Sequence, residues 1–258
     1  MQPLRTIRVT RYVTPLREGG SLPAIVEADD DGLYVLKFRG AGQGARALIA
    51  ELVSGEIARA AGLPVPELVF AELDEDLART EPDPEIHALI RDSAGLNLAL
   101  DYLPGSVTFD PAVHKLDADL ASRIVWLDAY LTNVDRTARN TNMLLWHKRL
   151  WLIDHGATMY FHHTPDWESA PSRAREPFAL LQNHVLLPMA TRLDAVDQPM
   201  TSALTEETLS AIVGAVPDSW LRDRSSSDAG MLRDAYVRYL TERLQPPRVF
   251  VEESARVR

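Results

Sequence analysis

The hydrophobic pattern of the chain changes at Pro104-Gly105, and this change limits the possible folds more than any other feature. Before it, short apolar runs of strand length are separated by turn residues, and after it apolar residues recur at helical spacing. Runs of strands followed by runs of helices are typical of α+β proteins or of two packed lobes. The sequence therefore predicts a strand-rich region over residues 1–104 and a mainly helical region over residues 105–258.

The first region has the pattern of a small sheet with one helix. Two short apolar runs flank the turn Asp29-Asp30-Asp31-Gly32, which is typical of a β-hairpin. Ala, Leu and Glu residues over 43–61 predict a helix that ends at Gly62. Residues 74–94 are acidic and contain proline, so we expect a surface excursion there. The predicted strands cover residues 6–13, 24–28, 33–38, 65–73 and 96–103.

The second region is expected to hold several helices and one hairpin. The apolar runs 143–146 and 150–153 flank a polar turn and predict the hairpin. Residues 157–175 are irregular and give no assignment, and the tail after Pro246-Pro247 is expected to be loosely held. The predicted helices cover residues 118–132, 176–186, 205–214 and 228–244.

The composition excludes several classes of protein. Of the 258 residues 46% are hydrophobic, which is a globular composition rather than a disordered or fibrous one. Acidic residues number 37 against 27 Lys plus Arg, and the net charge of −10 argues against general binding to nucleic acid or to anionic membranes. The absence of cysteine excludes disulfides, thiolate nucleophiles and sulfur-ligated zinc. We find neither a signal-peptide pattern nor a long apolar run, so we expect a cytoplasmic protein.

Lysine is rare in this chain, and this draws attention to Lys37. Only three of the 27 basic residues are lysines, a bias typical of a GC-rich bacterial genome. Alternation along the predicted strand 33–38 puts Tyr34 and Leu36 on one face and Val35 and Lys37 on the other. A strand lysine alone is most often a solvated edge charge, so the meaning of Lys37 depends on the residues that accompany it.

Four features follow one another in an order that suits phosphoryl transfer. Glycines let backbone N–H groups approach phosphates closely, and a strand lysine, held by a glutamate on the next helix, offers a charge to the α- and β-phosphates. A loop aspartate can orient and deprotonate a hydroxyl, while Asn and a second Asp supply the oxygen ligands that Mg²⁺ prefers. The candidates in chain order are Gly19, Gly20 and Ser21, then Lys37, Glu51, Asp135 with Asn140, and Asp154.

Some of these assignments have competitors in the sequence. Glu56 lies on the same predicted helix as Glu51 but is expected to be an exposed charge, and Asn142 competes with Asn140 as a turn residue or a second polar contact. The Gly-Gly pair could be an ordinary turn. His162 and His163, near His155, invite a metal site, but a surface loop is the better interpretation because no further ligand has suitable spacing.

Together these motifs resemble those of the HipA-like kinases, with phosphatidylinositol 3-/4-kinases as more distant relatives. The helix that carries Glu51 leads into Gly62-Leu63-Pro64-Val65-Pro66, which is similar to the Gly-Leu-x-Val-Pro turn of HipA proteins. Asp135-Arg136, with Asn140 five residues after the aspartate, resembles the catalytic loop of both families. Asp154-His155-Gly156 resembles the metal-binding Asp-Phe-Gly segment, in a form that some lipid kinases carry.

The resemblance covers roughly residues 15–160 and implies an α+β, two-lobed protein-kinase-like fold. Residues 1–104 would form the strand-rich N-lobe and residues 105–258 the mainly helical C-lobe. Residues 100–105 look like a kinase hinge, so Asp101 and Leu103 would meet adenine. Two departures stand out: Thr137 occupies the position of a histidine in lipid kinases, and the glycine turn lacks a GxGxxG pattern.

The function expected from the resemblance is that of an ATP- and Mg²⁺-dependent kinase. Such an enzyme would move the γ-phosphoryl group to an acceptor hydroxyl, with protein Ser/Thr as the first choice and a small molecule as the alternative. A nucleotide-binding pseudokinase or scaffold module is the alternative of a different class, and AMP transfer at the same site stays open. Neither nucleic acid nor membrane is expected as a direct partner.

Overall fold

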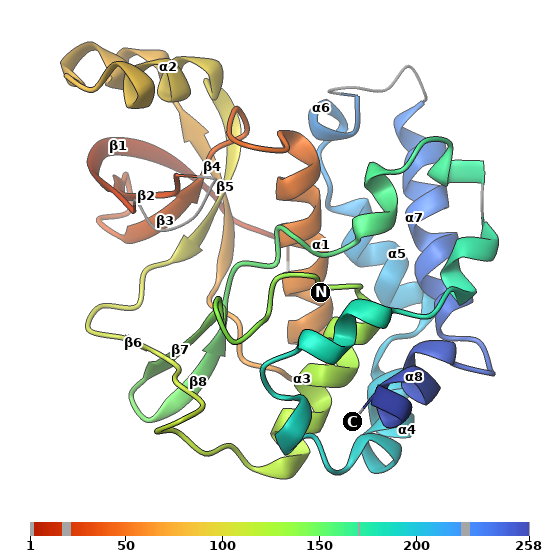
Figure 1. Cartoon of the computed structure of the whole chain (residues 1–258). Coiled ribbons are helices and arrows are strands. Elements are labelled where there is room, and N and C mark those ends of the chain that lie inside the picture. The colour runs from red at the N-terminus through yellow and green to blue at the C-terminus, as the bar shows by residue number, and fades with distance from the viewer. Residues whose placement is uncertain (1–2, 17–21, 170, 223–227, 258) are drawn as a thin grey trace.

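The computed structural model describes residues 3–16, 22–169, 171–222 and 228–257. It is a mixed α/β fold in which a barrel of strands packs against a larger helical region, with helix α1 between them (Figure 1). The candidate glycine turn, Gly19-Gly20-Ser21, lies outside the described residues.

The first region forms a small closed barrel. Its strands are β1 (Thr6–Pro15), β2 (Ala24–Ala28), β3 (Leu33–Lys37), β4 (Leu68–Leu73) and β5 (Gly95–Asp101), in the order β1-β2-β3-β5-β4. The strand predictions and the hairpin between β2 and β3 are therefore confirmed. The pairing of β1 with β4 is parallel and closes the sheet, and Val26, Leu36 and Val69 fill its interior.

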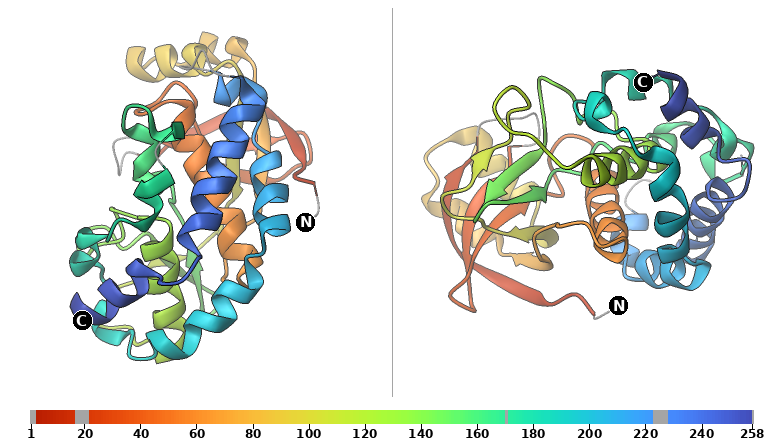
Figure 2. Two further views of the ribbon diagram at one scale, coloured as in Figure 1. Left: turned by 90° about the vertical axis from the view of Figure 1, so that its right-hand side faces the viewer. Right: turned by 90° about the horizontal axis from the view of Figure 1, so that it is seen from below.

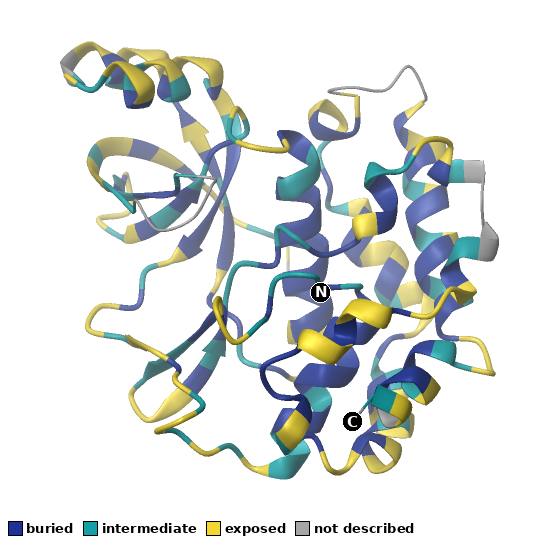
Figure 3. Ribbon diagram, viewed as in Figure 1, coloured by how far each residue is buried: buried dark blue, intermediate teal, exposed yellow. Residues whose placement is uncertain are grey.

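Helix α1 (Ala45–Ala60) is buried on nearly every side, because the barrel lies on one flank and the helical region on the other (Figure 3). It ends as predicted. Gly62 adopts a φ of 73°, a conformation that favours glycine, and the Leu63 N–H bonds back to the carbonyl of Ala58 at 2.9 Å. After this turn the chain leads directly to strand β4.

The predicted surface excursion over residues 74–94 is instead a helical cap on the barrel. It consists of the 3₁₀ helix η1 (Glu75–Thr80) and helix α2 (Pro84–Asp92). Asp83 caps α2 by accepting a hydrogen bond from the Glu85 N–H, and Pro84 is its first residue. Ile86 and Ile90 on one face of α2 are buried against the barrel core, which is why this acidic segment folds.

The helical region contains the predicted hairpin, formed by β7 (Met143–Trp146) and β8 (Arg149–Leu152), to which the short strand β6 (Val107–Thr108) is added. The predicted helix over 176–186 is wrong, because that segment contains a 3₁₀ turn between Pro177 and Pro188. The helices are α3 (Ala118–Tyr130), α4 (Leu193–Ala203), α5 (Glu206–Gly214), α6 (Asp218–Leu221), α7 (Ala229–Arg243) and α8 (Val249–Val257). The 3₁₀ turns are η2 (Tyr160–His163), η3 (Trp167–Ser169), η4 (Pro171–Arg175), η5 (Ala179–Asn183) and η6 (Leu187–Met189).

The tail after Pro246-Pro247 is not loosely held, because helix α8 docks on α3. Phe250 is buried against Trp126 and Tyr130, with ring centroids 5.2 and 5.8 Å apart. Arg248 also pairs with Asp197 of α4. Figure 2 shows α8 close to α3 and α4, and α5 and α7 side by side, with α5 packed against α1. None of the described helices is long and apolar enough to cross a membrane.

Candidate active site

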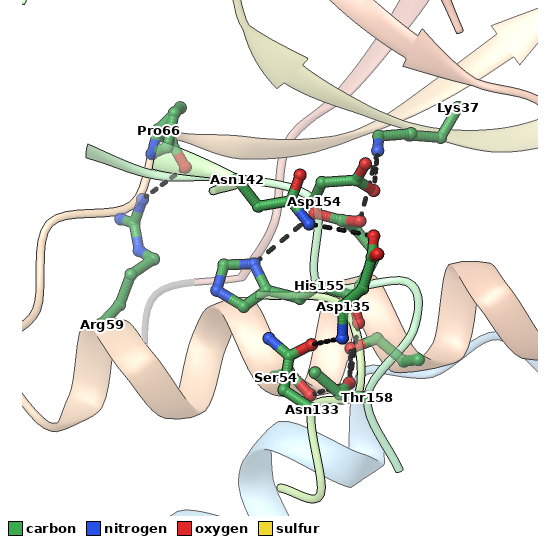
Figure 4. A network of polar contacts seen from close by, with 12 residues as sticks. Lys37, Ser54, Arg59, Pro66, Asn133, Asp135, Asn142, Asp154, His155 and Thr158 are labelled. Atoms are coloured by element: carbon green, nitrogen blue, oxygen red, sulfur yellow. Dashed lines mark hydrogen bonds and ion pairs between the residues drawn. The ribbon is translucent and has the colours of Figure 1, made fainter. Parts of the chain in front are cut away.

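A cleft of about 1510 Å³ separates the barrel from the helical region. Lys37 and Asp101 line it from the ends of barrel strands, Leu103 from the connection between the two regions, and Asn140 and Asp154 from the helical side. Lys37, Asp101 and Asp154 thus meet at one concave surface, although they come from distant parts of the chain. Glu51 and Asp135 do not line the cleft themselves; they contact residues that do. The close-up in Figure 4 shows Lys37 reaching from its strand toward Asp154.

Lys37 is the last residue of β3, and its side chain is only 11% exposed. Its Nζ donates a hydrogen bond to Oδ1 of Asp154 at 2.6 Å and lies 3.5 Å from Oε2 of Glu51. Burial alone would lower the pKa of Lys37, but the two carboxylates outweigh it and raise the pKa above its ordinary value. The ammonium group is therefore fixed in its charged form at the edge of the cleft.

Glu51 projects from α1 into the space between Lys37 and His155. Its Oε1 lies 3.6 Å from Nδ1 of His155, and its side chain is 2% exposed. Burial raises the pKa of Glu51, yet the charge of Lys37 and the contact with His155 reverse this and lower it to about 2. The competing Glu56 is buried rather than exposed, and it pairs with Arg59 instead of Lys37.

The candidate catalytic loop connects α3 to β7. Oδ2 of Asp135 accepts hydrogen bonds from the side-chain amides of Asn140 at 2.7 Å and Asn142 at 3.1 Å. The Asp135 N–H donates to the side chain of Asn133 at 3.0 Å. Asn142 immediately precedes β7, and its carbonyl accepts from the N–H of Ile153, so it lies beside Asp154. Sequence reasoning favoured Asn140, whereas the structure brings both asparagines to Asp135.

Asp154 follows β8 and has a φ of 56°, a left-handed conformation that is uncommon outside glycine but that aspartate adopts more often than most residues. The next residues are held on α1. Ser54 and Thr158 share a hydrogen bond of 2.6 Å between their hydroxyls, and Thr158 also donates to the carbonyl of His155 at 2.7 Å. His155, which the sequence associates with a surface loop, is instead completely buried. The Asp154 carboxylate is 41% exposed and faces the cleft.

Part of the cleft lining is apolar. Val35 and Leu100 contribute from the barrel, and Met143 and Ile153 from the helical side. Asp101 and Leu103, the residues of the hinge prediction, also line the cleft, and burial raises the pKa of Asp101. The segment that contains the candidate glycine turn begins and ends at the cleft, since Leu16 donates to the carbonyl of Pro23 at 2.7 Å and both residues line it.

One feature of the candidate site escaped sequence reasoning. Asp128, inside the apolar helix α3, is completely buried and forms an ion pair with Arg136 at 2.5 Å, next to the candidate catalytic Asp135. His184 donates to the same carboxylate from a distant part of the chain. A charged residue in the apolar run Ile124–Tyr130 was the available signal, because a buried acid requires a partner.

The donor set suits a divalent cation held partly by a ligand. In the parts of the chain that the structure describes, no group of three or more His, Asp or Glu residues could hold a metal by itself. Asp154 offers carboxylate oxygens to the cleft, and each asparagine that donates its amide nitrogen to Asp135 keeps an amide oxygen. Mg²⁺ is commonly bound by one or two such groups together with substrate phosphates, so these residues fit it.

Comparisons with known proteins give the family and the fold of the chain. A family model described as HipA-like kinase matches residues 9–246. The chain is similar in structure to the Helicobacter pylori proinflammatory kinase CtkA, with a TM-score of 0.59 and 12% identity over 98% of this chain and 99% of that one. Two structures of the Golgi casein kinase, one with Mn/ADP bound, match with TM-scores of 0.44 and 0.43 and identities of 10% and 11%, over 95% of this chain and 72% and 73% of theirs. A comparison with curated protein sequences gave no match.

Proposed function

Because this chain belongs to the HipA-like kinase family, we propose that it is an ATP- and Mg²⁺-dependent phosphotransferase. The reaction moves the γ-phosphoryl group of ATP to an acceptor hydroxyl. One observation carries the proposal: Lys37, which pairs with two carboxylates, and the two asparagines that donate to Asp135 line a single cleft from opposite sides. Lys37 and Asp154 are 117 positions apart in the chain, so the fold itself assembles this pairing.

The roles follow from position and charge. Lys37, held by Glu51, neutralises the α- and β-phosphates, since its ammonium stays protonated and projects into the cleft. Its present hydrogen bond to Asp154 is one that a phosphate oxygen can replace. Asp154 and the oxygens of Asn140 and Asn142 would hold Mg²⁺, which neutralises charge on the phosphates when bound.

Asp135 is the group that handles the proton. It orients the acceptor hydroxyl and takes its proton while the hydroxyl oxygen bonds to the γ-phosphorus and the bond from that phosphorus to the bridging oxygen of ADP breaks. Asn140 and Asn142 hold the carboxylate by one oxygen, which leaves the other for the acceptor. Positioning and charge stabilisation, rather than covalent chemistry on the protein, then supply the rate.

The proposal assigns the remaining parts of the cleft as well. Residues 1–104 act as the N-lobe and residues 105–258 as the C-lobe, with adenine against the apolar wall near Asp101 and Leu103. Gly19, Gly20 and Ser21 would cover the phosphates from the end of β1. A protein Ser/Thr hydroxyl is the proposed acceptor, a small-molecule hydroxyl is the competing one, and the cytoplasm is the proposed location.

The test begins with nucleotide binding and ends with transfer. Thermal unfolding of wild type, Asp154→Ala and the exposed control Asp194→Ala is measured with ATP, with and without Mg²⁺. The melting temperature of wild type and of the control should rise only when ATP and Mg²⁺ are both present, because a ligand that binds the folded state stabilises it. Asp154→Ala lacks a proposed Mg²⁺ ligand and should show no rise. Incubation with γ-labelled ATP and a protein or a small-molecule hydroxyl library then identifies the acceptor class. A folded wild type that neither gains stability nor transfers label would refute the proposal.

A further inference from the structure

Asp128 on α3 is the centre of a buried hydrogen-bond network behind the candidate catalytic loop. Its Oδ2 accepts from Nε of Arg136 at 2.5 Å and from Nε2 of His184 at 2.9 Å, and its Oδ1 accepts from the amide of Asn133 at 2.8 Å. Burial raises the pKa of Asp128, but the charge of Arg136 and the His184 hydrogen bond reverse this and hold it well below its usual range. The carboxylate is therefore ionised and has three donors.

Two routes lead from this carboxylate to Asp135. On one side Asn133, fixed by Asp128, accepts from the backbone N–H of Asp135 at 3.0 Å. On the other side Arg136 donates to the carbonyl of Asn142 at 2.5 Å, and the amide of Asn142 donates to the Asp135 carboxylate at 3.1 Å. A shift of Asp128 or of its donors would thus reach both the main chain and the side chain of Asp135.

His184 is the member of this network that comes from outside the loop and its helix. Nδ1 of His184 accepts from the Leu186 N–H at 3.0 Å, so the ring proton lies on Nε2 and is donated to Asp128. The main chain follows the same path. Val185 donates to the carbonyl of Arg136 at 3.1 Å, and a bridge pairs Thr137 with His184. The segment of 3₁₀ turns thereby contacts the candidate catalytic loop directly at His184 and Val185.

We propose that His184 is a positioning residue for Asp135, and this inference rests on the proposed function. His184 ties the segment of residues 157–190 to the Asp128 carboxylate, which holds the candidate catalytic loop. The docking of that segment and the orientation of Asp135 are therefore coupled. His184 lies 56 positions from Asp128, and none of its hydrogen bonds reaches Lys37, Asp154 or the apolar wall of the cleft. Its loss should therefore reduce turnover without weakening nucleotide binding.

The test compares three variants of the full chain. His184→Ala removes the donor, and His184→Gln restores a side-chain N–H at similar reach. His162→Ala is the matched control. It removes another buried imidazole from the same segment, one whose hydrogen bonds go to Tyr236 and His163 rather than to the loop. The readouts are kcat, the KM for ATP, thermal stability, and hydrogen exchange of peptides covering residues 133–142 and 24–38.

For His184→Ala we expect kcat to fall by about tenfold to 10²-fold, the size of effect that misplacing a reacting group by about 1 Å produces, with the KM for ATP nearly unchanged. Exchange should rise in residues 133–142 and not in 24–38. His184→Gln should recover most of the turnover, and His162→Ala should lower stability without either change.

Wild-type turnover and exchange in His184→Ala would overturn the inference. So would parallel losses in His184→Ala and His162→Ala, because these would report general unfolding. If wild type transfers no phosphoryl group at all, the proposed function has failed instead. The exchange comparison then still decides whether His184 holds the loop, since equal exchange in wild type and His184→Ala would overturn that link.

Discussion

Two buried carboxylates, Glu51 and Asp128, lie beside similar partners but are held in different ways. Each has one permanent cation and one histidine as neighbours: Lys37 and His155 for Glu51, Arg136 and His184 for Asp128. The Glu51 contacts are 3.5 and 3.6 Å long, beyond good hydrogen-bond geometry. The Asp128 contacts are 2.5 and 2.9 Å, and Asn133 adds a third at 2.8 Å.

The difference divides the candidate site into two halves. The half that contains Lys37 and Glu51 is adjustable, and the half that contains Asp135 and Asp128 is fixed. A carboxylate with three short hydrogen bonds in a low-dielectric interior defines one geometry, because any departure leaves a buried charge unsatisfied. Glu51 constrains Lys37 by charge rather than by a short hydrogen bond, and the closest partner of Lys37 is the half-exposed Asp154. Lys37 can therefore turn toward a phosphate while Glu51 stays in place, whereas Asp135 depends on a network that should not move.

The largest expected effect is on the fixed half. Asp135→Asn should lower kcat by about 10²–10⁴-fold, because the proposed general base is lost while the asparagine keeps nearly the same shape. The affinity for ATP should change little, since Asp135 contacts the asparagines and not Lys37. Steady-state kinetics with ATP as the varied substrate measures both quantities. If the turnover of Asp135→Asn equalled that of wild type, the proposed role of Asp135 as general base would be wrong.

A smaller effect, of a different kind, is expected on the adjustable half. Lys37→Met removes the proposed charge-assisted contact to the phosphates and should weaken ATP binding by about 10–100-fold. Lys115→Met, at an exposed position outside the cleft, is the matched control and should bind as wild type does. Titration calorimetry with Mg²⁺ and a non-hydrolysable ATP analogue compares them. Equal affinities of the two variants would contradict the assignment of Lys37.

Stability measurements compare the two carboxylates directly through isosteric changes. Asp128→Asn leaves Arg136 buried without its counter-charge and should lower the free energy of unfolding by about 3–5 kcal/mol. Glu51→Gln should cost clearly less, because Lys37 keeps Asp154 as a partner. Urea unfolding at neutral pH gives both values. If Glu51→Gln cost as much as Asp128→Asn, the two sites would be equally rigid and the comparison would fail.

The pH dependence of the free energy of unfolding shows whether Glu51 is charged or neutral in the folded protein. The folded-state pKa of Glu51 is about 2, against an ordinary value of 4.5, so its ionisation stabilises the fold fully above pH 4.5. That contribution is lost as the pH falls toward about 2. The stability difference between wild type and Glu51→Gln should thus shrink over this range, as urea unfolding at a series of pH values measures. A difference that stays constant down to pH 3 would contradict an ionised, paired Glu51.

The sequence was most informative where a local pattern decides the structure. Period-two alternation and the Asp29–Gly32 turn specify β2 and β3, and this alternation also puts Lys37 on the cleft side of its strand. The charged motifs could be found in the sequence because each stands next to its own turn or helix signal. Their residues lie in or beside the cleft. Closure of the barrel by β1 and β4 had no local signature, since it depends on a pairing of strands distant in the chain.

The failures have a common physical cause in tertiary contacts. Helix α2 was missed because its charge suggested a solvated segment, although Asp83-Pro84 is a helix-start signal and Ile86 and Ile90 bury one face. His162 was expected on a surface loop and is instead buried against Tyr236. Asp128 could be recognised as unusual, but its partner His184 follows only from the folded chain.

The smallest expected effect concerns the attachment of α1 to the segment after Asp154. Ser54→Ala removes the buried hydroxyl pair with Thr158, and Thr158 keeps its hydrogen bond to the His155 carbonyl. The free energy of unfolding should fall by about 1 kcal/mol, the net value of one such hydrogen bond, while ATP affinity stays close to that of wild type. Ser202→Ala, on the exposed face of α4, is the control and should change stability by less than about 0.5 kcal/mol. Because Glu51 lies one turn before Ser54 on α1, a large loss of ATP affinity in Ser54→Ala would mean that the Lys37 half is as rigidly held as the Asp135 half, contrary to the comparison.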